Sequence, residues 1–238
     1  MKFSGKIEPE HHPDDALPMN ASLPRPIVAI ASILLAGILV ASRACAIEAL
    51  LLQDTYVDNG TTAGESPPNA SNYGAGMDLH VFKGNGRIGR AFLKFSLETL
   101  PPGTAAGHVT HARLRLWVNA KSTAAGSITL TPVITRWDEY TLSDNAARDL
   151  AFGRPQLSEL PVESINNFIS IDVTDWVKAW LGGKLINEGI EIAPSSNTKF
   201  LDLAFDSKES DRTSHEARLE ISLDKGENPT QRRSSESD

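Results

Sequence analysis

Apolar and polar residues alternate in many short runs between residues 50 and 223. In the clearest run, Leu114 and Leu116 share one face while Arg115 and Trp117 share the other, as in a half-buried β-strand. Similar runs, separated by Gly, Pro and Asn residues, predict strands at residues 50–57, 77–83, 90–97, 109–118, 127–135, 169–173, 189–193, 199–205 and 218–223. This series predicts an all-β fold, an antiparallel β-sandwich of jelly-roll type, because a parallel sheet would need a helix after most strands.

The hydrophobic period changes from two to 3.6 residues after Val173. Trp176, Val177, Trp180 and Leu181 then fall on one apolar arc, which predicts a short amphipathic helix over 174–181. Thr174 is the expected cap of this helix, and Gly182 and Gly183 are expected to end it. We expect the two tryptophans to be part of the core, since aromatic residues at helical spacing usually are; an exposed platform for a ligand is the alternative.

The composition and net charge of the chain argue against several classes of function. The chain has 238 residues, 40% of them hydrophobic, and a net charge of −7. These values suit one large β-domain and make the chain a poor generic binder of nucleic acid or anionic membrane. The single cysteine, Cys45, excludes an intramolecular disulfide and a site built from several cysteines.

The first 46 residues have the pattern of a secretory signal. Ile27–Ser42 carries no charge and is too short for a transmembrane helix, which needs about 20 apolar residues. Ala44 and Ala46 fit a cleavage site, and a start at Met19 would give the short, basic leading region that such signals have. We therefore expect a secreted, extracellular protein with no stable membrane insertion after cleavage; a lipoprotein modified at Cys45 and an uncleaved anchor are the alternatives.

The chain after residue 46 is predicted to consist of one domain and a tail. Residues 47–224 are expected to form the β-domain. Residues 225–238 are charged, rich in serine and poor in apolar residues, which predicts a disordered tail.

An ordered series of motifs resembles DNRLRE-type domains, which are similar to carbohydrate-binding module family 96. The series covers about residues 51–223 and consists of Asp54-Thr55-Tyr56-Val57, Asn72-Tyr73-Gly74, Arg90–Phe95, Ala112–Leu116, the Trp137 segment, Ile171–Thr174 with Trp180, Asn187–Ile190, Phe205–Glu209 and Ala217–Ile221. Family members often have a second tryptophan and a proline soon after the Trp137 position, whereas this chain has neither in residues 141–145.

The resemblance implies an extracellular, non-catalytic β-sandwich module with a binding or structural role, and alginate binding is known in some members. We therefore expect a secreted carbohydrate-binding protein whose ligand is an acidic polysaccharide or a cell-surface matrix. A structural or adhesive surface protein without a small glycan ligand is the alternative. We expect no enzyme, because no Gly-x-Ser-x-Gly turn, phosphate-binding loop or acid–base pair is evident.

Candidate ligand-binding residues lie first on the clearest strand. Arg113, Arg115 and Trp117 share one of its faces, where a ring could stack on a pyranose and guanidinium groups could bind uronate carboxylates. Lys94 alternates on a strand that we expect to be a neighbour of this one, and it would then extend the same surface. The alternative is that a loop covers the face and acidic side chains pair with the arginines.

Aromatic residues in loop-like segments form a second candidate set: Tyr73, Trp137 and Tyr140. Trp137 can equally anchor its long loop to the core. We expect no cofactor and no metal site. Structural calcium is the alternative, and its oxygen ligands would come from Asp54, Asp58, Asp206, Glu209 and Asp211, whose spacing does not match an EF-hand loop.

Overall fold

A computed structural model describes residues 45–60, 69–122 and 126–224. The predicted signal segment up to Ala44 and the predicted tail lie outside the described residues. Within the described ranges, no helix has the length and apolar content needed to cross a membrane.

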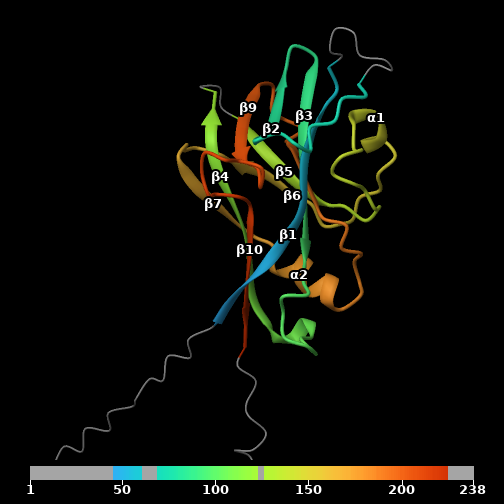
Figure 1. Ribbon diagram of the computed structural model, residues 1–238, viewed down its shortest axis with the longest axis vertical. Coiled ribbons are helices and arrows are strands. Elements are labelled where there is room, and N and C mark those ends of the chain that lie inside the picture. The colour runs from blue at the N-terminus through green and yellow to red at the C-terminus, as the bar shows by residue number, and fades with distance from the viewer. Residues whose placement is uncertain (1–44, 61–68, 123–125, 225–238) are drawn as a thin grey trace, which may run out of the picture. The chain divides into compact units, whose positions relative to one another are not determined.

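Ten β-strands, two short α-helices and one 3₁₀ helix make up the described chain (Figure 1). The strands are β1 (Cys45–Asp58), β2 (Asp78–Gly84), β3 (Arg87–Ser96), β4 (Val109–Lys121), β5 (Ser127–Pro132), β6 (Leu157–Pro161), β7 (Asn167–Asp172), β8 (Ile190–Pro194), β9 (Leu201–Asp206) and β10 (Arg218–Leu223). The helices are α1 (Asp144–Ala147) and α2 (Thr174–Leu181), with the 3₁₀ helix at Ala106–His108. Between the predicted strands at 127–135 and 169–173, where the sequence predicted no element, the chain contains α1 and β6.

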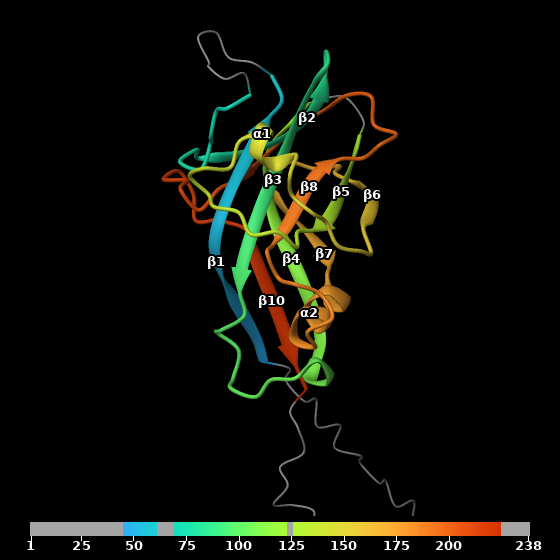
Figure 2. The ribbon, with the colours of Figure 1, turned by 90° about the vertical axis from the view of Figure 1, so that its right-hand side faces the viewer.

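All strand pairs are antiparallel, and six of the strands close into a barrel. Hydrogen bonds connect β1, β10, β4, β9, β2 and β3 in that order, and β3 pairs again with β1. Strands β8, β5 and β6 extend the sheet beyond β3, while β7 pairs with β4 (Figure 2). The prediction of a mostly β fold with one minor amphipathic helix is confirmed; the division into the two facing sheets of a sandwich stays a prediction.

Closure depends on strands that change partners along their length. In β1, residues 45–49 pair with β10, whereas residues from Leu50 onward pair with β3. The register shifts between Leu51 and Gln53, an irregularity that bends the strand and increases its twist. Strand β1 thereby pairs with both β10 and β3, and this closes the six-strand barrel.

The core lies on the inner face of this barrel. Leu114, Leu116 and Val118 of β4 are fully buried, as their alternation predicts. Val109 is also buried, although the same alternation places it on the outer face with Trp117. A register shift between Ser222 and Leu223 of β10 explains the error, because a one-residue shift moves a side chain to the opposite face.

A second, smaller apolar cluster covers the outer side of β3. The alternation predicts that Phe92 shares a polar face with Arg90 and Lys94, but Phe92 is fully buried. The segment that follows β5 covers it, and the cluster consists of Val57, Phe92, Val133, Trp137, Leu142 and Ala147. Strand β3 is therefore buried on both faces, which period-two alternation alone does not reveal.

Trp176, Val177 and Trp180 of helix α2 are buried, as predicted, and the helix packs against β4. The predicted cap is wrong: Thr174 is the first helical residue, and its backbone N–H donates to the Asp172 carboxylate at 2.9 Å. The Thr174 hydroxyl instead accepts from the Ala112 N–H at 2.9 Å, which ties the helix to β4. The helix ends before Gly182 and Gly183, as expected, and Gly183 has a φ of 67°.

Candidate functional site

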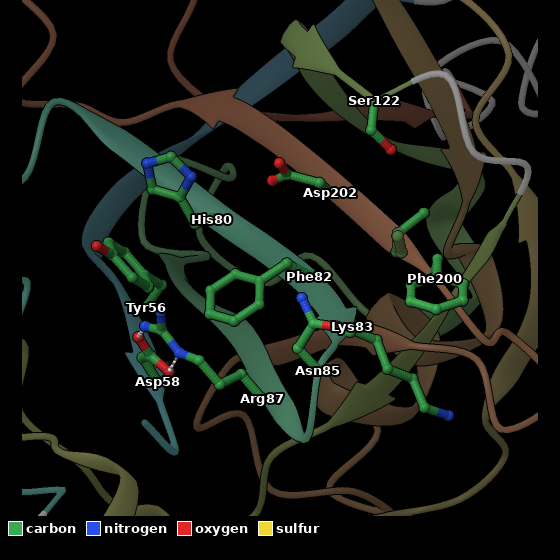
Figure 3. A pocket seen from close by; sticks show the side chains of 12 residues that line it. Tyr56, Asp58, His80, Phe82, Lys83, Asn85, Arg87, Ser122, Phe200 and Asp202 are labelled. Atoms are coloured by element: carbon green, nitrogen blue, oxygen red, sulfur yellow. Dashed lines mark hydrogen bonds and ion pairs between the residues drawn. The ribbon is translucent and has the colours of Figure 1, made fainter. Parts of the chain in front are cut away.

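An open cleft of about 660 Å³ lies on the outer face of the sheet, over β2 and β9 and beside β1. Three aromatic rings line it, those of Tyr56, Phe82 and Phe200, so we call it the ring cleft (Figure 3). Its polar lining comprises Asp58, His80, Lys83, Asn85, Arg87, Ser122 and Asp202. The cleft therefore combines apolar ring faces with hydrogen-bonding groups.

The β2–β3 hairpin shapes one side of the cleft. Its turn residues Asn85 and Gly86 have φ angles of 52° and 77°, the positive values that a type I′ turn requires. Phe82 faces Gly89 across the hairpin, and a Cβ atom at Gly89 would lie 2.3 Å from the Phe82 ring. Glycine at position 89 thus lets the ring lie over the neighbouring strand.

Arg87 extends from this hairpin to β1. Its guanidinium group pairs with the Asp58 carboxylate and lies 5.4 Å from the centre of the Phe82 ring. The hydrogen bond with Asp58 raises the pKa of Arg87 above its usual value. The Arg87 side chain is 57% exposed, whereas that of Asp58 is 6% exposed, so mainly the cation faces the solvent.

Tyr56 occupies the β1 side of the cleft and is held between two other rings. The Tyr73 ring stacks on it at 4.2 Å and 16°, and His80 contacts it edge-on at 5.0 Å. Burial raises the pKa of Tyr56 to about 12. These contacts fix the orientation of Tyr56, so the ring is already positioned before any ligand binds.

The Asn72-Tyr73-Gly74 motif explains how Tyr73 is placed. The Asn72 amide donates to the backbone oxygens of Glu139 and Leu142, at 2.7 and 2.8 Å. A Cβ atom at Gly74 would lie 2.3 Å from the Glu139 backbone oxygen, so only glycine fits this close approach.

The predicted β4 residues lie on the outer face but outside the ring cleft. Trp117 stacks on His215 at 3.9 Å and meets Phe168 edge-on at 5.0 Å. Arg115 lies 4.5 Å from the centre of the Phe168 ring and pairs with Glu220 at 2.8 Å. Arg113 is exposed. The face is thus partly covered and partly paired with acidic groups, as the alternative in the sequence analysis describes.

A polar network separates this β4 face from the ring cleft. The Asn119 amide donates to the carboxylates of Asp78 and Asp206, at 2.6 and 2.7 Å, which joins β4 to β2 and β9.

Lys94 does not extend the β4 face. It lies on β3, which pairs with β1, β2 and β8 but not with β4, and its ammonium group pairs with Glu188. The expected neighbour relation between the two strands was wrong, because strand order depends on pairing between distant segments.

The three loop aromatics have different surroundings. Trp137 is 5% exposed, and its indole N–H donates to the Glu188 backbone oxygen at 2.6 Å, so it anchors its segment to the smaller core cluster. Tyr140 is 62% exposed and does not line the ring cleft. Only Tyr73 contacts a residue of the cleft.

A buried acidic cluster lies apart from the ring cleft. Carboxylate oxygens of Asp54, Glu139 and Glu209 lie within 4.8 Å of one another, a separation that a metal ion could bridge. The Lys208 ammonium pairs with Glu139 at 2.7 Å and with Glu209, so a side chain already supplies a cation. Burial, with a contribution from Glu209, raises the pKa of Asp54 to about 8.

The set of calcium ligands expected from the sequence is not assembled. Of its five members only Asp54 and Glu209 belong to the buried cluster. Asp58 pairs with Arg87, Asp206 accepts from Asn119, and Asp211 is exposed. Among the described residues, the carboxylates close enough to share a metal ion are therefore those of Asp54, Glu139 and Glu209, which Lys208 already contacts.

Sequence reasoning missed Phe82, Phe200, Tyr56 and Arg87 as site residues. A usable signal existed in β2, where His80 and Phe82 alternate with the buried Leu79 and Val81. An aromatic ring on the exposed side of a strand indicates a surface contact, but the partner rings come from distant strands.

The comparisons with known proteins agree with the resemblance. A family model described as Carbohydrate-binding module family 96 matches residues 48–222. A search of curated proteins found no significant match.

Proposed function

Because the match spans most of the chain, the protein belongs to carbohydrate-binding module family 96, and we propose that it is a secreted, non-catalytic protein that binds a polysaccharide in the ring cleft. Membership supports carbohydrate binding in general. We propose, in addition, that the protein is secreted, that its ligand is a polysaccharide and that the ligand binds in the ring cleft.

The observation that carries the proposal is the set of exposed rings around the cleft. Phe200 is 56% exposed, and Phe82 and Tyr56 are half-buried, so each presents an aromatic surface to the cleft. Pyranose rings have apolar faces that stack on aromatic rings, while their hydroxyl groups need hydrogen-bond partners. Asp202, His80 and Ser122 provide such partners in the same cleft.

An acidic polysaccharide is the proposed ligand class. Lys83 and Arg87 line the cleft, and Arg113 and Arg115 lie further along the same outer face. Guanidinium and ammonium groups form charge-assisted hydrogen bonds with carboxylates, so a long uronate chain would find cations at both places.

The non-catalytic part of the proposal rests on the carboxylates. Hydrolysis of a glycosidic bond usually needs two carboxyl groups facing the bond. Among the described lining residues only Asp58 and Asp202 carry a carboxylate, and Asp58 is held by Arg87. Secretion rests on the apolar segment 27–42 and the Ala44-x-Ala46 pattern.

A glycan array with the purified protein, followed by calorimetric titration of the best ligand, tests the proposal. Phe200→Ala and Phe82→Ala should each weaken binding by about tenfold or more, equivalent to roughly 1.4 kcal/mol. Tyr140→Ala is the matched control, since it removes an exposed aromatic ring outside the cleft and should leave affinity unchanged.

Two results would contradict the proposal. A loss with Tyr140→Ala but not with Phe200→Ala would place the site on the loop aromatics. A parent protein that binds no glycan on the array would favour the structural or adhesive alternative.

A further inference from the structure

A second groove, of about 570 Å³, lies directly beside the ring cleft. The two share five lining residues: Lys83, Gly84, Asn85, Arg87 and Phe200. Three positively charged side chains line this second groove, those of Lys83, Arg87 and Lys199, so we call it the cationic groove. No carboxylate is found among its lining residues within the described chain.

The ring cleft and the cationic groove differ in formal charge. The ring cleft contains Lys83 and Arg87 together with Asp58 and Asp202, so its formal charge is balanced. In the cationic groove Arg87 is neutralised by Asp58 from the cleft side, but no ion pair of Lys83 or Lys199 is found among the described residues. A negative group would therefore meet the ammonium groups of Lys83 and Lys199 in the groove, whereas in the cleft the carboxylate of Asp202 balances the charge of Lys83.

Both walls of the groove are held in place by the fold. One wall is the β2–β3 turn, whose Asn85 and Gly86 have fixed positive φ angles. The other is the loop from β8 to β9, where the Thr198 hydroxyl accepts from the Ser127 N–H at 3.0 Å and Ser195 contacts Thr129 at 2.9 Å. Thr198 and Ser195 are buried, so the loop that carries Lys199 is tied to β5.

Lys83 also connects the two walls. Its ammonium group donates to the Ser196 backbone oxygen at 3.2 Å, and in Figure 3 its side chain extends away from the Phe82 ring. This single hydrogen bond leaves two further N–H donors of the ammonium group for a ligand.

We propose that the cationic groove is an anion subsite, which binds the carboxylate or sulfate of the sugar unit next to the one stacked in the ring cleft. The inference rests on the proposed function and deepens it. It assigns the stacked sugar ring of the ligand to the ring cleft and the negative charge of the ligand to the cationic groove. The chain of the ligand then crosses Phe200, the aromatic residue common to both.

The test compares polygalacturonate with the same polymer after chemical reduction of its carboxyl groups. At low salt the parent protein should bind the acidic polymer about tenfold more tightly, and the preference should shrink as salt screens the charges. Lys199→Gln, alone and combined with Lys83→Gln, should reduce this preference toward equality. Affinity for the reduced polymer should stay the same in Lys199→Gln, because Lys199 does not line the ring cleft, whereas Lys83 lines both the cleft and the groove.

Lys184→Gln is the charge-matched control, since Lys184 is exposed and lies at the end of α2 outside both hollows. A sulfated galactan and its desulfated form serve as a second pair of probes. A preference confined to the sulfated form identifies sulfate as the anion, and a preference confined to polygalacturonate identifies carboxylate.

The inference is overturned if the parent shows no preference in either pair, or if the preference persists in the double variant. Loss of the preference with Arg115→Ala instead would place the anion on the β4 face. In each of these cases Phe200-dependent binding of the reduced polymer would still support the proposed function. Absence of binding to every polymer and to the array would overturn both.

Discussion

The two tryptophans of α2 should respond differently to the same substitution, although they lie one helical turn apart. Trp176 is 1% exposed, and its indole N–H donates to the Pro155 backbone oxygen at 3.1 Å. Trp180 is 7% exposed, and its indole N–H is buried with no partner among the described residues. Phenylalanine removes the N–H group in both cases and keeps an aromatic ring.

The expected difference follows from hydrogen bonding. Each Trp→Phe change leaves a similar cavity, at a cost of roughly 1–2 kcal/mol in the free energy of unfolding. Trp176→Phe also leaves the Pro155 oxygen without its donor, which adds about 1–3 kcal/mol. Trp180→Phe removes a buried donor that has no acceptor, and this gain of about 1–3 kcal/mol offsets the cost of the cavity. Trp176→Phe should therefore be more destabilising by about 2 kcal/mol or more.

Urea denaturation followed by far-ultraviolet circular dichroism measures both free energies without relying on tryptophan fluorescence. Equal losses, or a larger loss for Trp180→Phe, would refute the hydrogen-bond argument. Trp180→Ala calibrates the series and should cost roughly 3–5 kcal/mol, since it removes the whole buried ring. A loss below about 1 kcal/mol for Trp180→Ala would instead indicate a surface position and support the platform alternative.

Three further predictions concern the buried cluster, the cleft and the β4 face. Asp54 keeps its proton in the folded protein up to about pH 8 but titrates near 3.8 when unfolded, so its contribution to stability is complete below pH 3.8 and is lost as the pH rises toward 8. Asp54→Asn should flatten that loss in melting temperatures measured from pH 5 to 8, and an unchanged slope would contradict the assignment. Gly89→Ala should displace the Phe82 ring and weaken glycan binding in titrations while thermal melts still show a folded protein; unchanged affinity would mean that Phe82 is not a ligand contact. If the β4 face binds an acidic glycan, Arg115→Ala should weaken binding and reduce its salt dependence, whereas Trp117→Ala should weaken it at all salt concentrations, each by about 1–3 kcal/mol; parent-like binding by both variants would exclude this face.

The sequence by itself determined the local elements of this protein. The alternation along Leu114, Leu116 and Val118 located β4 and its buried face, and the change of period after Val173 located α2. Asn85 and Gly86 marked the turn of the β2–β3 hairpin. These signals are readable because periodicity and turn preferences depend on residues close together in the chain.

Tertiary structure alone decided which segments became neighbours. Phe92 alternates like a surface residue but is buried, because the segment after β5 packs on it. Lys94 looked like an extension of the Arg115 face, yet β3 and β4 do not pair. The ring cleft gathers Tyr56, Phe82 and Phe200 from three separate parts of the chain. Such sites form when distant segments pair and bury one another. The residue pattern within a single segment does not show which other segment it will contact.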